Sequence, residues 1–416
     1  MTVESSERAY HKIDISSDEF WSRSFVERDD AFAQLRRAGE ITWHPPLTAK
    51  LPYEEPGFWA IVRHEDIAYV SQNHELFSTA QGVGLPPMPP ESARQVSFFL
   101  AMDPPQHTRY RKIIGSAFTP KAARRIRSIV EGNAREIVDD MVGAGEIDFV
   151  DHCAALLPMR TVSDMIGIPR SERERVRRAG HKAFSGPQDE DGDVDPAAFF
   201  VEQMTILHEA AIELAQFRRK KPADDLMSSI VHSEVDGERL TDEEIGAFMF
   251  LLASAGNDTT KQATSISTWA LSKHPEQKKW LLDDFDGRIT MAMEEFVRYA
   301  SPVLDFARVA TQDTKIGDVT IKEGDKLGLF YCSSNRDESV FDEPHQFDLS
   351  RFPNPHQGFG GGGVHYCLGN QIAKTELQAI FSELFTRLPN LEVTGEPEWL
   401  SGNNFVNGIE HLPVRV

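Results

Sequence analysis

One cysteine in a glycine-rich segment has the surroundings of an iron ligand. Cys367 lies near the end of the segment Gly358–Gly369, directly before a helix predicted over 368–388. A helix N-terminus lowers the pKa of a thiol, and glycines let backbone N–H groups approach the sulfur. The pattern therefore fits an iron–thiolate site. A buried structural cysteine fits the same residues, whereas a phosphate-binding loop would require a Gly-Lys-Ser/Thr ending that is missing.

An acid and a hydroxyl, Asp258 and Thr259, interrupt an otherwise apolar helix pattern. The helix is predicted from Thr241 to Pro275, because a capping box opens it and no proline occurs in between. It would be about 50 Å long, enough to cross a domain. Gly256 weakens it by about 1 kcal/mol relative to alanine, so we expect a kink with a polar pocket. A surface turn would also explain the pair, although neighbouring apolar residues place this face inward.

The rest of the sequence supplies the elements that must position these residues. Helical spacing dominates 105–272, while short β-like runs occur in the first hundred residues and after Pro302. The sequence therefore predicts a mainly α fold with small β-sheets. No repeat or linker is visible, so we expect one domain over 1–416. An acidic stretch at 186–193 is predicted to be a surface loop.

Composition excludes several classes of protein. The 416 residues include 44 Lys and Arg against 65 Asp and Glu, a net charge of −21, which argues against a nucleic-acid binder. The three cysteines, Cys153, Cys332 and Cys367, are too few and too scattered for a disulfide framework. No apolar run approaches the roughly 18 residues that span a bilayer, and the N-terminus has no apolar signal segment. We expect a cytoplasmic protein with no membrane anchor.

A third pair, Glu295 and Arg298, lies three residues apart on a predicted helix, a spacing that alone usually marks an exposed ion pair. The cysteine loop, the acid–threonine pair and this pair, taken together, resemble the cytochrome P450 family of haem-thiolate monooxygenases over nearly the whole chain. The resemblance implies a single P450-type domain whose long central helix crosses over haem b, with Cys367 as the axial iron ligand. Asp258 and Thr259 would relay protons. Glu295 and Arg298 would join Arg351 in a buried structural network.

Further motifs match the parts of the family that hold the haem. His107 and Arg111 match a helix that faces the haem propionates, and Arg308 and His365 match the remaining propionate contacts. In the cysteine loop the resemblance assigns cofactor contacts to Phe359, Gly363 and Gly369. Phe359 lies eight residues before the cysteine, one more than the commonest family spacing. The extra glycine is expected to bulge the loop.

The resemblance also implies partners. O2 is the co-substrate, and electrons must come from an external ferredoxin and ferredoxin reductase, because the chain holds no flavin or iron–sulfur motif of its own. Basic residues near the proximal haem face would steer the ferredoxin: Arg109, Lys112, Arg124, Arg125, Arg127 and Lys374. A solvated helix face also explains these residues. We expect a monomer.

The residues expected to line the substrate pocket are almost all apolar, which suits a long hydrophobic substrate. They are Val83, Leu85, Met88, Phe98, Phe99, Phe248, Leu252, Ala255, Val303, Phe306, Phe405 and Val406. Asp305 is out of place in this wall and is expected to face solvent. The sequence is similar to the bacterial subgroup that oxidises terminal methyl groups of methyl-branched lipids and steroid side chains.

Three alternatives remain open. Hydroxylation of a terpenoid or macrolide at a non-terminal position would use the same apolar walls. A non-catalytic haem sensor would need Cys367 but neither Asp258 nor Thr259. A haem-free helical scaffold would show no Soret absorbance.

Overall fold

The computed structural model describes residues 8–49, 52–115, 120–185, 192, 194–234 and 237–416. Apart from residue 192, the acidic loop predicted at 186–193 lies outside these residues. The helices are α1 (Asp18–Ser22), α2 (Phe25–Ala38), α3 (His64–Gln72), α4 (Pro90–Ser97), α5 (Gln106–Gly115), α6 (Pro120–Met141), α7 (Leu156–Ile166), α8 (Arg170–Ser185), α9 (Pro196–Lys220), α10 (Leu226–His232), α11 (Asp242–Ala255), α12 (Asp258–Lys273), α13 (Pro275–Asp283), α14 (Phe285–Ala300), α15 (Tyr331–Ser334) and α16 (Asn370–Arg387). A short 3₁₀ helix, η1 (Phe98–Ala101), and a short π-helix, η2 (Val150–Ala154), lie between them.

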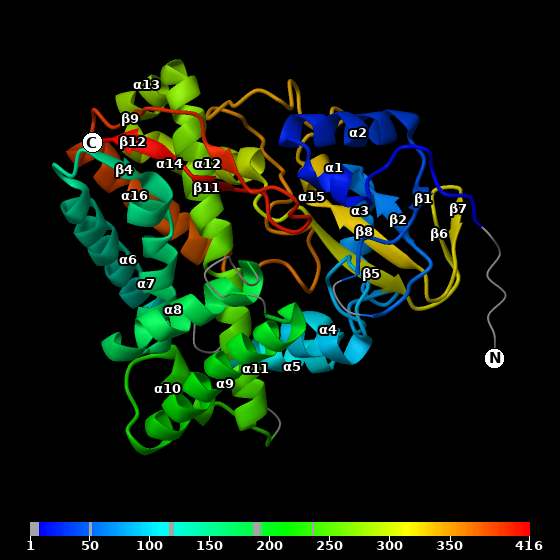
Figure 1. The fold of residues 1–416 in the computed structure, drawn as a ribbon, viewed down its shortest axis with the longest axis horizontal. Helices are drawn as coiled ribbons and strands as arrows, with labels where there is room; N and C mark the ends of the chain where they lie inside the picture. Colours follow the sequence, from blue (N-terminus) through cyan, green and yellow to red (C-terminus); the bar gives the residue numbers. More distant parts are fainter. Residues whose placement is uncertain (1–7, 50–51, 116–119, 186–191, 193, 235–236) are drawn as a thin grey trace.

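The strands form small sheets beside the helices (Figure 1). They are β1 (Thr42–His44), β2 (Phe58–Ile61), β3 (Phe77–Ser78), β4 (Glu146–Asp148), β5 (Asp305–Ala310), β6 (Thr314–Ile316), β7 (Val319–Ile321), β8 (Lys326–Phe330), β9 (Glu392–Val393), β10 (Glu398–Trp399), β11 (Ile409–His411) and β12 (Pro413–Arg415). The main sheet has the order β1-β2-β8-β5-β3, in which only β2 and β8 are parallel. The other described sheets are β4-β12-β9, β6-β7 and β10-β11.

Apolar residues form one large helical core and two smaller clusters at the main sheet. The stripe of α6 between Ile126 and Met141 is buried in the helical core, as its spacing predicts. Phe32 and Phe330 belong to one sheet cluster, and Ile61 and Leu327 to the other. The predicted fold class, mainly α with small β-sheets, is confirmed. Within the described residues, no helix is both long enough and apolar enough to cross a membrane.

The predicted central helix is two helices, α11 and α12, separated at Gly256 and Asn257. The capping box at its start is present, with the Glu244 N–H donating to the Thr241 hydroxyl at 3.2 Å. The disturbance is at the expected position, and Gly256 and Asn257 keep right-handed helical dihedral angles between the two segments. Glycine there favours a break, and the Thr259 hydroxyl donates to the Ala255 carbonyl at 2.9 Å, a contact that bends helices.

Glu295 and Arg298 on α14 form a wholly buried ion pair. Two nitrogens of Arg298 each donate to one carboxylate oxygen of Glu295 at 2.7 Å. Further N–H groups of Arg298 donate to the backbone carbonyls of Asn335, Pro344 and Gln346. Arg351 adds a second cation, with its Nε 3.4 Å from Glu295 Oε2. The structure thus brings the three side chains together and ties α14 to the irregular segment 335–351.

A second buried carboxyl group, Glu376, lies inside the helical core on α16. It is 2% exposed, and one of its oxygens has no hydrogen-bond partner among the described residues. Burial raises the pKa of Glu376 to about 8, although the hydroxyls of Thr161 on α7 and Thr260 on α12 act to lower it. Glu376 is therefore protonated at neutral pH and lies between the helix that follows Cys367 and the helix that carries Thr259.

We predict that Arg298→Met lowers the free energy of unfolding by about 3–5 kcal/mol, because it leaves the Glu295 carboxylate buried without its partner. The measurement is urea denaturation followed by circular dichroism. The matched control is Lys279→Met, which removes a cation from an exposed pair with Asp283 and should change the free energy by less than about 1 kcal/mol. Equal effects of the two variants would contradict the structural role of Arg298.

We also predict that Glu376 makes the protein less stable as the pH rises. Between its ordinary pKa of 4.5 and its folded pKa of about 8, the folded protein keeps a proton that the unfolded chain has lost. Unfolding free energy therefore falls with rising pH in this window, by up to about 1.4 kcal/mol per pH unit. Between pH 5 and 7.5, Glu376→Gln should abolish this fall of the unfolding free energy with rising pH. Glu131→Gln, on the exposed face of α6, should leave the fall unchanged. Parallel pH profiles for all three proteins would show the assignment to be wrong.

Candidate active site

The backbone of Cys367 is fixed at the start of α16. Its N–H donates to the Phe359 carbonyl at 3.0 Å, and its own carbonyl accepts the Asn370 side-chain amide at 2.7 Å. Gly369 is the N-cap of α16, so the thiol lies at the N-terminal end of this helix as predicted. The longer spacing between Phe359 and Cys367 is accommodated by glycines with positive φ, and it does not prevent the backbone bond between the two residues.

Two glycines of the loop pack against α3. A Cβ atom on Gly363, whose φ is +75°, would lie 2.3 Å from the Ser71 carbonyl oxygen. On Gly361 it would lie 2.5 Å from the Ser71 hydroxyl. Side chains are therefore excluded by the close approach of α3. The resemblance assigns Gly363 to cofactor binding. The structure adds a second reason for glycine at this position, which is its close contact with α3.

The protein surroundings of Cys367 do not by themselves favour a thiolate. Burial raises the pKa of the Cys367 thiol, and this effect exceeds the lowering by the backbone N–H groups of Gly369 and Asn370 and by Arg111. The lowered pKa expected from the helix N-terminus is therefore wrong for the polypeptide alone, because desolvation of the thiolate dominates. A coordinating metal cation deprotonates a thiol outright.

Two histidines and two arginines, from α5, β5 and the cysteine loop itself, gather at one place. The rings of His107 on α5 and His365 lie 4.2 Å apart between centroids. Arg308 on β5 is buried, and Arg111 on α5 donates to the Tyr366 carbonyl at 2.7 Å. The structure thus brings together all the residues predicted to hold the propionates, although they come from positions more than 200 residues apart.

Three imidazole nitrogens of this cluster are buried without a partner in the described part of the chain, whereas the two arginines and His365 Nε2 each have a protein contact. Among the described residues, neither ring nitrogen of His107 nor Nδ1 of His365 has a hydrogen-bond partner. Burial, followed by Arg111, lowers the pKa of His107 to about 4, and burial with Arg308 and His107 lowers that of His365 far below its usual range. Unpartnered buried donors of this kind match anionic oxygens. The residues therefore fit the two carboxylates of a haem group whose iron would lie at Cys367.

The acid–threonine pair opens α12. Asp258 forms an ion pair with Lys261 at 2.7 Å, and the Thr259 hydroxyl donates to the Ala255 carbonyl. Both side chains are only partly buried, and Ala255 is exposed. The Asn257 side-chain carbonyl oxygen, also at the break, is buried without a partner among the described residues. The helix break therefore presents a carboxylate and a hydroxyl beside free polar groups.

The predicted pocket residues fall into separate apolar groups. On one side Phe98 and Phe99 pack against Phe248, with ring centroids 6.3 and 6.4 Å away. On the other, Phe306 lies 5.6 Å from Phe405, and an isolated backbone bridge joins Val303 to Val406. Leu252 packs against the helical core, Met88 is half-buried, and Val83 accepts a hydrogen bond from the Ala307 N–H beside β5. These groups supply two aromatic surfaces.

Two residues of the predicted wall lie elsewhere. Asp305 does not face solvent as expected: it is wholly buried, neither carboxylate oxygen has a described partner, and burial raises its pKa well above the usual value. The reason is that β5 is an interior strand of the main sheet and five of its six residues are buried. Leu85 is buried in the sheet cluster that contains Phe330, with its side chain against Gly328.

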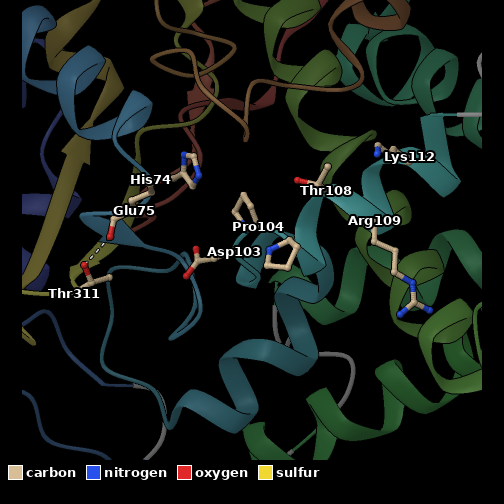
Figure 2. Close-up of a pocket in the computed structure, with 9 residues that line it drawn as sticks. His74, Glu75, Asp103, Pro104, Thr108, Arg109, Lys112 and Thr311 are labelled. Atoms are coloured by element: carbon tan, nitrogen blue, oxygen red, sulfur yellow. Dashed lines mark hydrogen bonds between the residues drawn. The ribbon is translucent and has the colours of Figure 1, made fainter. Parts of the chain in front are cut away.

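The predicted basic patch is largely neutralised. Arg109 pairs with Glu238, Arg125 with Asp224 at 3.2 Å, and Lys374 with Glu294 at 2.6 Å. The cations that stay exposed are Lys112, Arg124 and Arg127. A pocket of 620 Å³ beside α5 is lined by His74, Glu75, Asp103, Pro104, Pro105, Thr108, Arg109, Lys112 and Thr311. Figure 2 shows this pocket in close-up.

Comparison with known proteins agrees with this geometry. A family model described as Cytochrome P450 matches residues 195–400. The methyl-branched lipid omega-hydroxylase of Mycobacterium tuberculosis is 40% identical over 97% of this chain and 94% of its own length. The steroid C26-monooxygenase of Mycolicibacterium smegmatis is 34% identical over 92% of this chain and 90% of its own. A Mycobacterium marinum cytochrome P450 in complex with pseudoionone superimposes with a TM-score of 0.92 and 46% identity, covering 99% of this chain and 100% of that one. The chain belongs to the cytochrome P450 family of haem-thiolate monooxygenases.

Proposed function

We propose that this protein hydroxylates a terminal methyl group of a methyl-branched lipid or of an isoprenoid or steroid side chain, with haem b held through Cys367. The observation that carries the cofactor assignment is the cluster of His107, Arg111, Arg308 and His365, whose free donors would bind the propionates. The substrate class follows from the likeness to omega-hydroxylases and steroid monooxygenases together with the apolar walls. The whole of 1–416 would act as one domain.

The chain's own residues would control protons and water at the reacting group. When bound, the haem supplies the activation of O2 with electrons from outside. We assign Asp258 and Thr259 to proton delivery, because a carboxylate and a hydroxyl at the helix break can hold and pass a proton. The ion pair with Lys261, at 2.7 Å, would orient the Asp258 carboxylate. Phe98, Phe99 and Phe248 would exclude bulk water.

Electrons would come from an external ferredoxin and its reductase. Lys112, Arg124 and Arg127 remain exposed to attract an acidic partner, in a chain of net charge −21. We propose a cytoplasmic location, since Cys153 and Cys332 are buried free thiols that suit a reducing compartment. We also propose that the protein acts as a monomer.

The aromatic groups explain how a strong terminal C–H bond could be selected over weaker internal ones. This selection requires that the hydrocarbon chain of the substrate enter end-on, with the middle of the substrate kept away from the iron. We assign the constriction to Phe98 and Phe99 on one side and Phe306 on the other. A methyl branch would fill width that a straight chain leaves empty, and each extra buried methyl contributes about 0.8 kcal/mol, or about a fourfold preference.

Cys367→Ser should abolish the red-shifted absorption band of the ferrous–CO protein, because a serine cannot supply the thiolate. The measurement is the difference spectrum of the reduced protein with and without CO. Cys332→Ser, which alters a buried thiol of the sheet cluster, should keep the band. A band that survived in the Cys367 variant would refute the proposed ligand.

Products from branched fatty acids, a steroid with an intact side chain and pseudoionone should be mainly primary alcohols, and straight-chain acids should bind more weakly. Phe306→Ala should widen the constriction and raise the share of subterminal product. Phe352→Ala is the control, because Phe352 is 84% exposed. Product identification by mass spectrometry decides: mainly internal or ring hydroxylation by the unaltered protein would favour a terpenoid or macrolide hydroxylase instead.

A further inference from the structure

Three side chains from separate parts of the chain form a charged network on the outer side of the cysteine loop. Glu294 on α14 places one carboxylate oxygen 3.0 Å from His356 Nε2 and the other 2.6 Å from Lys374 Nζ on α16. The His356 side chain is 3% exposed and those of Lys374 and Glu294 are 19% and 29% exposed. The network is therefore largely shielded from water, so its charges are screened less than those on the surface.

The hydrogen bonds fix the direction of each group. The Gly358 N–H donates to His356 Nδ1 at 3.1 Å, which places the proton of a neutral imidazole on Nε2, where it donates to Glu294. His356 and Lys374 together lower the pKa of Glu294 against the opposing effect of burial. Glu294 is therefore a carboxylate held between a neutral donor and a cation, and the Glu294–Lys374 pair has no net charge.

Phe359 connects this network to the thiolate position. Lys374 Nζ lies 5.3 Å from the centroid of the Phe359 ring, and the His356 ring lies 5.7 Å from it. The Phe359 carbonyl accepts the hydrogen bond from the Cys367 N–H. A cation near an aromatic ring is attracted by the π electrons, so Lys374 holds the ring as well as the carboxylate. Lys374 thus points inward to the loop and is not a free cation for docking.

We propose that Glu294 and Lys374 form a charge-balanced pair, in which each side chain offsets the effect of the other on the reduction potential of the iron bound at Cys367. The proposal rests on the proposed haem function. Reduction moves one electron from the reduced ferredoxin to the ferric iron and adds one negative charge to the site. A nearby positive charge therefore favours the reduced state, and a nearby negative charge opposes it. In the paired state the two charges largely cancel.

This model predicts opposite effects from removing the two partners. Lys374→Met leaves the Glu294 carboxylate unbalanced and should lower the reduction potential. Glu294→Gln leaves the lysine unbalanced and should raise it. The double variant should return towards the potential of the unaltered protein, and Lys374→Arg should stay close to it. A purely structural role would instead move both single variants in the same direction, through loosening of the loop.

The experiment is a spectroelectrochemical titration of the purified haem protein with small redox mediators and no ferredoxin. The absence of ferredoxin separates the electrostatic effect from any effect on docking. Lys279→Met, on the exposed surface of α13, controls for the loss of a positive charge far from the loop. If Glu294→Gln fails to bind haem, the comparison of Lys374→Met with Lys374→Arg still decides, because only the first removes the charge.

Shifts of equal sign in the two single variants, or no shift in either, would overturn the proposal. If the potential of Lys374→Met is unchanged and a separate binding measurement shows weaker association with ferredoxin, the proposal is overturned and Lys374 is assigned to docking instead. These outcomes are distinct from failure of the proposed function, in which the unaltered protein itself would lack the ferrous–CO band of a thiolate-bound iron.

Discussion

The buried ion pair between Glu295 and Arg298 is the interaction on which the segment leading to the cysteine loop depends. Burying both charges has a large desolvation cost, which is offset only because the geometry is bidentate and the remaining N–H groups of Arg298 find backbone carbonyls. The carbonyls lie in a segment without regular structure, which is held by the guanidinium groups of Arg298 and Arg351. Glu294, the preceding residue, reaches the loop itself through His356 and Lys374. Two consecutive carboxylates on α14 thus hold different parts of the chain: Glu295 holds the segment before the cysteine loop, and Glu294 holds the two ends of the loop through His356 and Lys374.

Much of the site could be predicted from short patterns, because each motif is positioned by local structure. The cysteine before α16 and the break near Asp258 follow from glycines and helix signals within a few residues. The burial of Asp305 could not be predicted in this way, since the residues that pack against the two faces of β5 come from distant parts of the sequence. The same holds for Lys374, whose partner Glu294 lies 80 residues earlier.

Glu376 was missed although the sequence contained a signal. It lies four residues before Ile380 and eight before Leu384, both buried on α16, so it is in phase with the apolar stripe. A carboxyl residue in such a phase predicts a buried titratable group, because the helix cannot turn it to solvent without exposing its neighbours. Attention to polar residues on the buried face, in addition to apolar ones, would have identified it.

The close packing of the glycine loop against α3 has a mechanical consequence. Gly361 and Gly363 touch Ser71 beside the main sheet, whereas the chain a few residues later enters α16 in the helical core. The propionate-binding residues are likewise divided, with Arg308 on β5 and His107 on α5. A haem bound by all of these residues would connect the main sheet to the helical core. Loss of the cofactor would then let the two parts melt independently, so that a single cooperative unfolding transition separates into two.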